Sequence, residues 1–274
     1  MKDVLKKTRD YKKNMKTLLG IYRLMKIGVY IVGCLFMIAF VIPNSSPENR
    51  GRIIRRWARK LPEMIGIRIE HTGTLDCPEA FDSGITPNAI GRLLVSNHVT
   101  FLDPFVIDAV LPAGFVAKAE IGRWPVIGKI ASAVGTIYIE RSNKRALIGI
   151  AETMEKALRE GRNVLVFPEG TTSDGLGLLK LHSNLFEASA KTEAPTIPLI
   201  VRYKKDGKPT TIASWTGHEP LMTRLWAILC TKGLSVTVEI LPTITGTNRH
   251  ELCRLTSAAM SERLGIADPL AETK

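Results

Sequence analysis

Short apolar runs rich in β-branched residues alternate with longer polar stretches from residue 66 to the end of the chain. Eight runs predict strands, at 66–71, 92–97, 114–118, 135–140, 163–167, 196–203, 210–214 and 235–242. A helix is predicted at 144–160, where apolar residues recur at helical spacing before Gly161. The segment 77–88 has the composition of a loop. Strands separated by helices predict an α/β fold, a mostly parallel central sheet flanked by helices.

The pattern before residue 60 is different, because the sixteen residues 27–42 carry no charge. This run is shorter than the ~20 residues that span a bilayer as a straight helix. Residues 18–26 lengthen it if Arg23 and Lys26 extend their charged ends to the interface. A secretory signal competes with this interpretation, but the basic start is long and 43–47 lacks a cleavage site. We expect a membrane-associated helical segment rather than an ordinary buried helix.

The positive charge lies almost entirely in this N-terminal part. The net charge is +12, and residues 1–60 hold 15 Lys and Arg against 3 Asp and Glu, while 61–274 hold 23 of each. We therefore predict a basic, membrane-anchoring helical module at 1–60 and a neutral α/β domain at 61–274. A basic arm can also bind nucleic acid, but this one lacks interleaved stacking aromatics and leads into the apolar run. Anionic lipid is the expected partner.

Basic residues flank the apolar run on both sides, again in 50–60. Lys and Arg collect on the cytoplasmic side of a membrane, so a segment that crosses once cannot satisfy both flanks. A re-entrant or in-plane pair of helices satisfies both. We expect monotopic attachment to the cytoplasmic face of the inner membrane, with a single pass as the alternative.

Other familiar motifs are incomplete. The stretch 122–129 resembles a phosphate-binding loop, but its glycines are wrongly spaced and Ile130 replaces the Ser or Thr that would bind magnesium. No G-x-S-x-G sequence is present. The four cysteines have no metal-ligand or disulfide spacing, so we expect buried thiols in a reducing compartment and no metal or other cofactor.

His98 and Asp103 follow the predicted strand 92–97. Five residues along an α-helix leave two side chains about 140° apart, so the pair meets only if His98 lies in a turn and Asp103 begins a helix. Asp103 suits the N-cap and Pro104 the first helical position. A simple helix cap is one interpretation. The other is a dyad in which Asp103 orients His98 and His98 deprotonates a hydroxyl.

Two more polar stretches end predicted strands. After 163–167 come Glu169, Gly170 and Thr171, where backbone amides and hydroxyls can bind an oxyanion or a phosphate. After 135–140 comes Arg141, a residue type suited to phosphate or carboxylate. The alternatives are a turn with a solvated Glu169 and a solvated helix start.

Four of these stretches, in order, resemble the glycerolipid acyltransferases that include 1-acylglycerol-3-phosphate acyltransferase: NHVTFLD, GTIYIER, FPEGT and TIPLI, within residues 60–215. The resemblance implies that His98 is the general base and Asp103 its orienting partner. It also implies that acceptor-lipid binding involves Arg141, Glu169 and Gly170, with Lys118 contributed by the similar stretch 117–128. Its implied partners are a lyso-lipid acceptor and a thioester donor, acyl-CoA or acyl carrier protein.

One departure concerns the acceptor headgroup. Lysophosphatidate enzymes commonly read E-G-T-R-S in the third block, whereas this chain has Thr172 in place of the arginine. Together with 214–229, this block resembles the branch that acylates lyso-ornithine lipid, whose headgroup is not a phosphomonoester. Lys180 and His182 could supply charge to a phosphate instead. The sequence leaves both acceptors open, and a non-catalytic lipid-binding protein is the alternative from another class.

Overall fold

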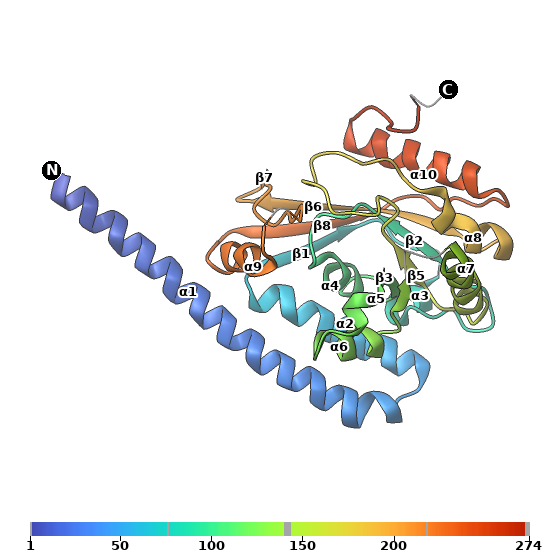
Figure 1. Cartoon of the computed structure of the whole chain (residues 1–274), viewed down its shortest axis with the longest axis horizontal. Helices are drawn as coiled ribbons and strands as arrows, with labels where there is room; N and C mark the ends of the chain where they lie inside the picture. Colours follow the sequence, from blue (N-terminus) through green and yellow to red (C-terminus); the bar gives the residue numbers. More distant parts are fainter. Residues whose placement is uncertain (1, 76, 140–143, 218, 272–274) are drawn as a thin grey trace.

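The computed structural model describes residues 2–75, 77–139, 144–217 and 219–271 (Figure 1). An eight-stranded sheet has the order β1-β8-β6-β2-β5-β3-β4, with β7 paired to β6. Its strands are β1 (Ile67–Thr72), β2 (Leu93–Ser96), β3 (Gly114–Lys118), β4 (Ile137–Ile139), β5 (Val164–Val166), β6 (Thr196–Lys205), β7 (Lys208–Pro209) and β8 (Leu234–Ile240). Neighbours from β6 to β4 are parallel, while β8 is antiparallel to β6 and parallel to β1. The predicted α/β fold with a mostly parallel sheet is confirmed.

Helices cover both faces of the sheet (Figure 1). The elements are α1 (Lys2–Phe36), the π-helical η1 (Met37–Val41), the 3-10 helical η2 (Ile42–Asn44), α2 (Pro47–Met64), α3 (Pro78–Ser83), α4 (Asp103–Asp108), α5 (Ala119–Gly122), α6 (Ile127–Ala133), α7 (Lys144–Arg159), the 3-10 helical η3 (Ser183–Phe186), α8 (Glu187–Thr192), α9 (Leu221–Leu229) and α10 (Arg249–Leu264). Alternate residues of β2 enter different cores: Leu94 joins residues of α2 and α4, while Leu93 and Val95 join residues of α7 and α10.

Two sequence predictions are corrected. Residues 210–214 do not form a strand, because the chain leaves the sheet after Thr210 donates its amide to Tyr203 and then turns. The predicted loop 77–88 contains α3, which begins at Pro78 and ends before Gly84 in a left-handed conformation (φ 72°). A proline in the first turn and a glycine after the last are ordinary helix boundaries, which the loop-like composition concealed. The helix predicted at 144–160 is confirmed as α7.

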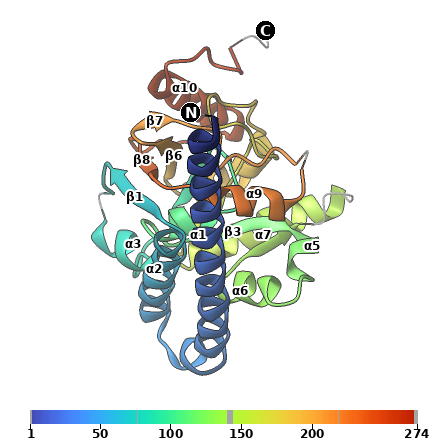
Figure 2. The ribbon, with the colours of Figure 1, turned by 90° about the vertical axis from the view of Figure 1, so that its left-hand side faces the viewer.

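The N-terminal helix α1 lies along one side of the molecule and turns through η1 and η2 into α2 (Figure 2). Ser46 caps α2 by accepting the amide of Asn49. The predicted domain boundary near residue 60 falls inside α2, which contacts α3, α4 and β1. The helical hairpin is therefore joined to the α/β body through α2.

One stripe of α1 is buried against the α/β body. Arg23, Tyr30 and Cys34 are each less than 9% exposed. The Arg23 guanidinium donates to the carbonyls of Leu229 (2.9 Å) and Thr231 (2.6 Å) at the C-terminal end of α9. Arg23 therefore does not extend toward an interface, which corrects that prediction, because the carbonyls at a helix end are strong acceptors for a buried cation.

Candidate functional site

The candidate site lies where β2 and β5 end side by side at the same edge of the sheet, an edge we call the carboxyl edge. After β2, the Asn97 side chain takes over the pairing with β6: it accepts the amide of Val201 (2.8 Å) and donates to the carbonyl of Val201 (3.1 Å). Because the Asn97 side chain makes both hydrogen bonds of the Val201 backbone on β6, the main chain at His98 can turn away from the sheet.

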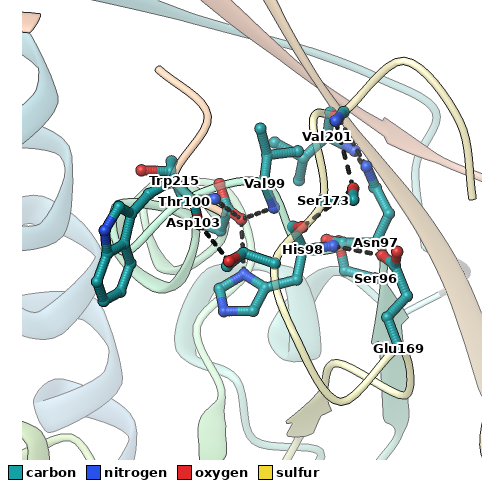
Figure 3. Close-up of polar contacts among 12 residues, drawn as sticks. Ser96, Asn97, His98, Val99, Thr100, Asp103, Glu169, Ser173, Val201 and Trp215 are labelled. Atoms are coloured by element: carbon teal, nitrogen blue, oxygen red, sulfur yellow. Dashed lines mark hydrogen bonds and ion pairs between the residues drawn. The ribbon is translucent and has the colours of Figure 1, made fainter. Parts of the chain in front are cut away.

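His98 and Asp103 form the predicted pair (Figure 3). The Nδ1 atom of His98 lies 2.8 Å from Oδ2 of the fully buried Asp103. The same oxygen accepts the amides of Val99 (2.6 Å) and Thr100 (2.9 Å). The N-cap of α4 is Leu102, so the cap prediction was wrong by one residue. Asp103 binds the amides of the preceding turn rather than those of its own helix, and thereby fixes the turn that presents His98.

Tyr203, which the sequence did not identify, completes the surroundings of Asp103. Its buried hydroxyl donates to Asp103 Oδ1 at 2.9 Å. Burial, followed by the nearby Asp103 charge, raises the pKa of Tyr203 well above its usual range, so the phenol remains a neutral donor. The two residues are 100 positions apart, and a tyrosine at the end of a buried strand was the only available signal.

The imidazole of His98 is held in one orientation with one edge open. An ionised Asp103 requires the proton on Nδ1, which leaves the lone pair on Nε2. The ring stacks on Phe167 with centroids 4.1 Å apart and 19° between planes. The His98 side chain is 22% exposed, so a substrate hydroxyl can reach it. Within the described residues, no Ser, Thr or Cys side chain is hydrogen-bonded to the ring.

Glu169 binds the backbone of the His98 turn. Its buried carboxylate accepts the amide of His98 (2.7 Å) and that of Leu179 (3.1 Å). Burial raises the pKa of Glu169 to about 7, although these two amide bonds act in the opposite direction. The amide of Ser173 also donates to the carbonyl of His98 (2.7 Å). The β5 loop therefore holds His98 through both of its backbone polar groups.

The remaining residues of this loop have separate positions. Gly170 has φ 71°, a conformation that favours glycine. Thr171 is exposed, and Thr172 donates its hydroxyl to the carbonyl of Trp215. The amide of Trp215 in turn donates to the carbonyl of Val99 (2.9 Å). Thr172 thus fastens the segment before α9 to the site.

Two further residues, Lys118 and Arg141, were predicted to bind the acceptor. Lys118 is exposed at the end of β3, which adjoins β5 at the carboxyl edge. Arg141 lies outside the described residues. The four cysteines are free, with Cys34 and Cys253 buried and Cys77 and Cys230 partly exposed. No group of three or more metal-ligating side chains is found in the described part of the chain.

Known proteins that resemble this chain point to one activity. The Acyltransferase family matches residues 81–202. The chain is 33% identical over 85% of its length to the 1-acyl-sn-glycerol-3-phosphate acyltransferase of Neisseria meningitidis serogroup B, and covers 83% of that protein. It is equally 33% identical to the lyso-ornithine lipid O-acyltransferase of Pseudomonas aeruginosa, over 82% of each chain. The crystal structure of the 1-acyl-sn-glycerophosphate (LPA) acyltransferase PlsC from Thermotoga maritima has the same fold, with a TM-score of 0.67 over 93% of this chain and 96% of that one, at 18% identity.

Proposed function

Because this chain belongs to the acyltransferase family, we propose that it transfers a fatty acyl group from a thioester to the hydroxyl of a lyso-lipid at the membrane surface. The observation that carries this proposal is the His98 imidazole, held at Nδ1 by the buried Asp103 and open at Nε2. Such a histidine suits the deprotonation of a hydroxyl.

The reaction needs no nucleophile from the protein. His98 Nε2 removes the proton of the acceptor hydroxyl, and the oxygen attacks the carbonyl carbon of the thioester. The carbon–sulfur bond of the tetrahedral intermediate then breaks, and the thiolate receives the proton from the imidazolium. Asp103 stabilises the imidazolium between the two steps. The products are an acylated lipid and the free thiol of coenzyme A or acyl carrier protein.

For the acceptor, Thr172 favours a lyso-lipid without a phosphomonoester, such as lyso-ornithine lipid. Its hydroxyl is already bound to the Trp215 carbonyl, and no guanidinium stands at this position. Lysophosphatidate is the second candidate, because the relatives that act on each acceptor are equally similar to this chain. Arg141, Gly170, Thr171 and Lys118 are proposed as acceptor-binding residues.

For the membrane, we propose monotopic attachment to the cytoplasmic face of the inner membrane, through anionic lipid. Residues Asn14–Asn44 are long and apolar enough to cross a bilayer, judged by length and composition. However, Arg23 is bound to the end of α9, and α1 also contacts α6, so the helix is packed against the α/β body. A spanning helix would draw that body into the hydrocarbon, whereas a helix in the interface leaves it in water.

The test uses membranes that contain the wild-type chain, His98→Ala or His250→Ala, with labelled acyl-CoA or acyl carrier protein as donor. Each is offered lysophosphatidate, lyso-ornithine lipid and another lysophospholipid. His250 lies exposed on α10 and serves as the matched control. We expect His98→Ala to lose at least about 1,000-fold of the activity on one acceptor, with His250→Ala unchanged. Full activity of His98→Ala would reject His98 as the general base, whereas no acylation by the wild type beside an active control enzyme would support a non-catalytic lipid-binding protein.

A further inference from the structure

A cavity of about 160 Å³ lies where the strands β3, β4 and β5 begin, at an edge of the sheet that we call the amino edge. Its walls are the first turns of α2, the ends of α3 and α6, and the residues at the starts of those strands. Asn163 lines the cavity just before β5, and Phe167, which stacks on His98, follows the same strand. The four residues between them extend roughly 13 Å. The cavity is therefore separate from the catalytic site.

Two arginines line this cavity with most of their donors unused. Arg50, on α2, donates from Nη2 to the carbonyl of Ile42 at 3.4 Å. Arg162, just before β5, donates from Nη2 to Glu160 at 2.8 Å. The Nε atoms of both arginines are buried without a hydrogen-bond partner in the described part of the chain. Because a guanidinium has five N–H donors in a planar fork, both side chains have donors left for a ligand.

Asn163 adds an unpartnered acceptor to the same lining. It is 1% exposed, and its Nδ2 donates to the carbonyls of Ala80 (3.1 Å) and Pro112 (3.2 Å). Its Oδ1 receives no hydrogen bond from any described residue. Buried polar atoms in folded proteins nearly always have a partner. Three orphaned polar atoms around one cavity therefore indicate that a polar ligand belongs there.

The cavity has room for such a ligand on the Gly135 side. Gly135 has φ 82°, and a Cβ added there would meet only Gly114 Cα and Arg162 Nη1, each at 3.9 Å. The Arg162 guanidinium thus borders open space. One water needs roughly 10–15 Å³ of such space, so the cavity is large enough for a tetrahedral oxyanion with a small substituent.

The charge of the lining favours an anion. No Asp or Glu is among the described residues that line the cavity. The simplest alternative is that the arginines neutralise the C-terminal ends of α3 and α6, which carry partial negative charge. However, Arg50 binds Ile42 and Arg162 binds Glu160, and no hydrogen bond from either guanidinium to a carbonyl of α3 or α6 is found among the described residues. Two guanidinium groups on one ligand favour a phosphate group, which carries more charge than a carboxylate.

We propose that the amino-edge cavity is a second ligand site, which binds a phosphate group through the guanidinium groups of Arg50 and Arg162. The group belongs to inorganic phosphate, to a small soluble phosphomonoester or to a phosphomonoester lipid headgroup. A hydroxyl of the ligand, or a water bound with it, donates to Asn163 Oδ1. This inference goes beyond the proposed function, because a ligand at the amino edge does not contact His98.

The test is isothermal titration calorimetry on the full-length chain in a non-ionic detergent and chloride buffer. The three probes are inorganic phosphate, glycerol 3-phosphate and dihexanoyl phosphatidate, one for each source of the phosphate group. Arg50→Gln and Arg162→Gln remove the charges, and Arg254→Gln, exposed on α10, is the matched control. We expect at least one probe to bind the wild type with a Kd of about 1 mM or lower. Each cavity variant should weaken that binding at least about tenfold, with the control unchanged.

A further variant keeps both arginines. Ala133→Asp adds a carboxylate to the wall of the cavity, and it should abolish binding of the probe, because the aspartate pairs with the guanidinium groups and repels the anion. Circular dichroism and thermal unfolding identify any variant that fails to fold. If an arginine variant does not fold, Ala133→Asp decides the question alone.

The proposal is overturned if the wild type binds none of the probes, or if binding is unchanged in Arg50→Gln and Ala133→Asp. Binding that instead disappears in Lys180→Gln, on the loop after β5, would assign the phosphate to the carboxyl edge and also reject the amino-edge site. Calorimetry requires neither an acyl donor nor turnover. An inactive acyltransferase that binds phosphate through Arg50 would leave this site standing, and an active one without such binding would do the reverse.

Discussion

At the scale of single residues, the carboxylate of Asp103 is the centre of the site, because it receives four hydrogen bonds. His98, Val99 and Thr100 bind one oxygen, and Tyr203 binds the other. A carboxylate that receives this many hydrogen bonds is fixed in one position. Tyr203 is therefore a positioning residue that acts on His98 through Asp103.

Tyr203→Phe should lower kcat by roughly 10- to 150-fold, because one hydrogen bond to a charged group contributes about 1.5–3 kcal/mol. The acid limb of the pH profile should move to higher pH, because a carboxylate with one donor fewer holds a protonated imidazole more strongly. Rates measured from pH 5 to 9 in both proteins check this. A loss of activity without any shift of the profile would indicate a merely structural role for Tyr203.

Glu169 has two candidate roles, acceptor binding and support of the catalytic turn. The variant Glu169→Gln distinguishes them. In Glu169→Gln the amide group can accept only one of the two backbone amides, and its NH2 group opposes the other. The contacts with His98 and Leu179 lead us to expect a fall in kcat of about 10-fold or more with little change in the KM for the acceptor. A large rise in that KM with kcat retained would instead support direct acceptor binding.

The sequence located this site as far as local spacing allows. His98 and Asp103 lie only five residues apart, in the turn between a strand and a helix. Their contact could therefore be predicted from local spacing alone. Tyr203 is 100 positions from Asp103, and the partner of Thr172 is 43 positions away. Such contacts depend on the order and register of the strands, which no local pattern records.

At the scale of elements, most strands and the helix α7 were predicted, whereas the short helices and α10 (Arg249–Leu264) were not. The β-branched runs marked β1 to β6 and β8. The signal is clearest in the central strands β2, β5 and β6, because buried parallel strands are nearly continuous in apolar residues. Residues 210–214 have a similar composition, but only Ala213 and Ser214 are buried, and for another reason. Ala213 joins the hydrophobic core, and Ser214 donates to the carbonyl of Asp174 in the loop that follows β5. Composition shows that a segment is buried, and it does not show against what.

The attachment of α1 gives a prediction at this scale. Arg23→Met should destabilise the packing of α1 by roughly 1–3 kcal/mol, because the carbonyls of Leu229 and Thr231 lose their donor. Lys26→Met is the matched control, since Lys26 lies three residues further along the same helix over the ring of Tyr22. Limited proteolysis of α1 in detergent measures the effect. Equal cleavage rates for the two variants would contradict a clamp at Arg23.

At the scale of the whole molecule, a buried acid makes stability depend on pH. Burial raises the pKa of Asp108 to about 8, against the opposing effect of the Ala113 amide. Below about pH 4 both the folded and unfolded chains hold this proton. As the pH rises toward 8, the unfolded chain releases the proton and the folded chain keeps it, so the contribution of Asp108 to folding stability falls.

Asp108→Asn removes this titration and keeps an oxygen for the Ala113 amide. The variant should therefore gain stability relative to the wild type as the pH rises from 5 to 8, by about 2 kcal/mol or more. Urea unfolding at the two pH values in the same detergent measures the difference. A difference between the proteins that stays constant with pH would mean that Asp108 is already ionised in the folded chain.

The pairing of the first strand with the last has a consequence for the order of events during synthesis. In the sheet, Ile67 of β1 lies opposite Leu234 of β8, and the carbonyls that receive Arg23 belong to residues 229 and 231. A ribosome releases α1, α2 and β1 long before any of these partners has been made. The apolar surface of α1 is thus without its protein neighbours for most of translation, and the bilayer is available throughout. We expect the nascent chain to reach the membrane first and the enzyme to fold there, around a helix already in place.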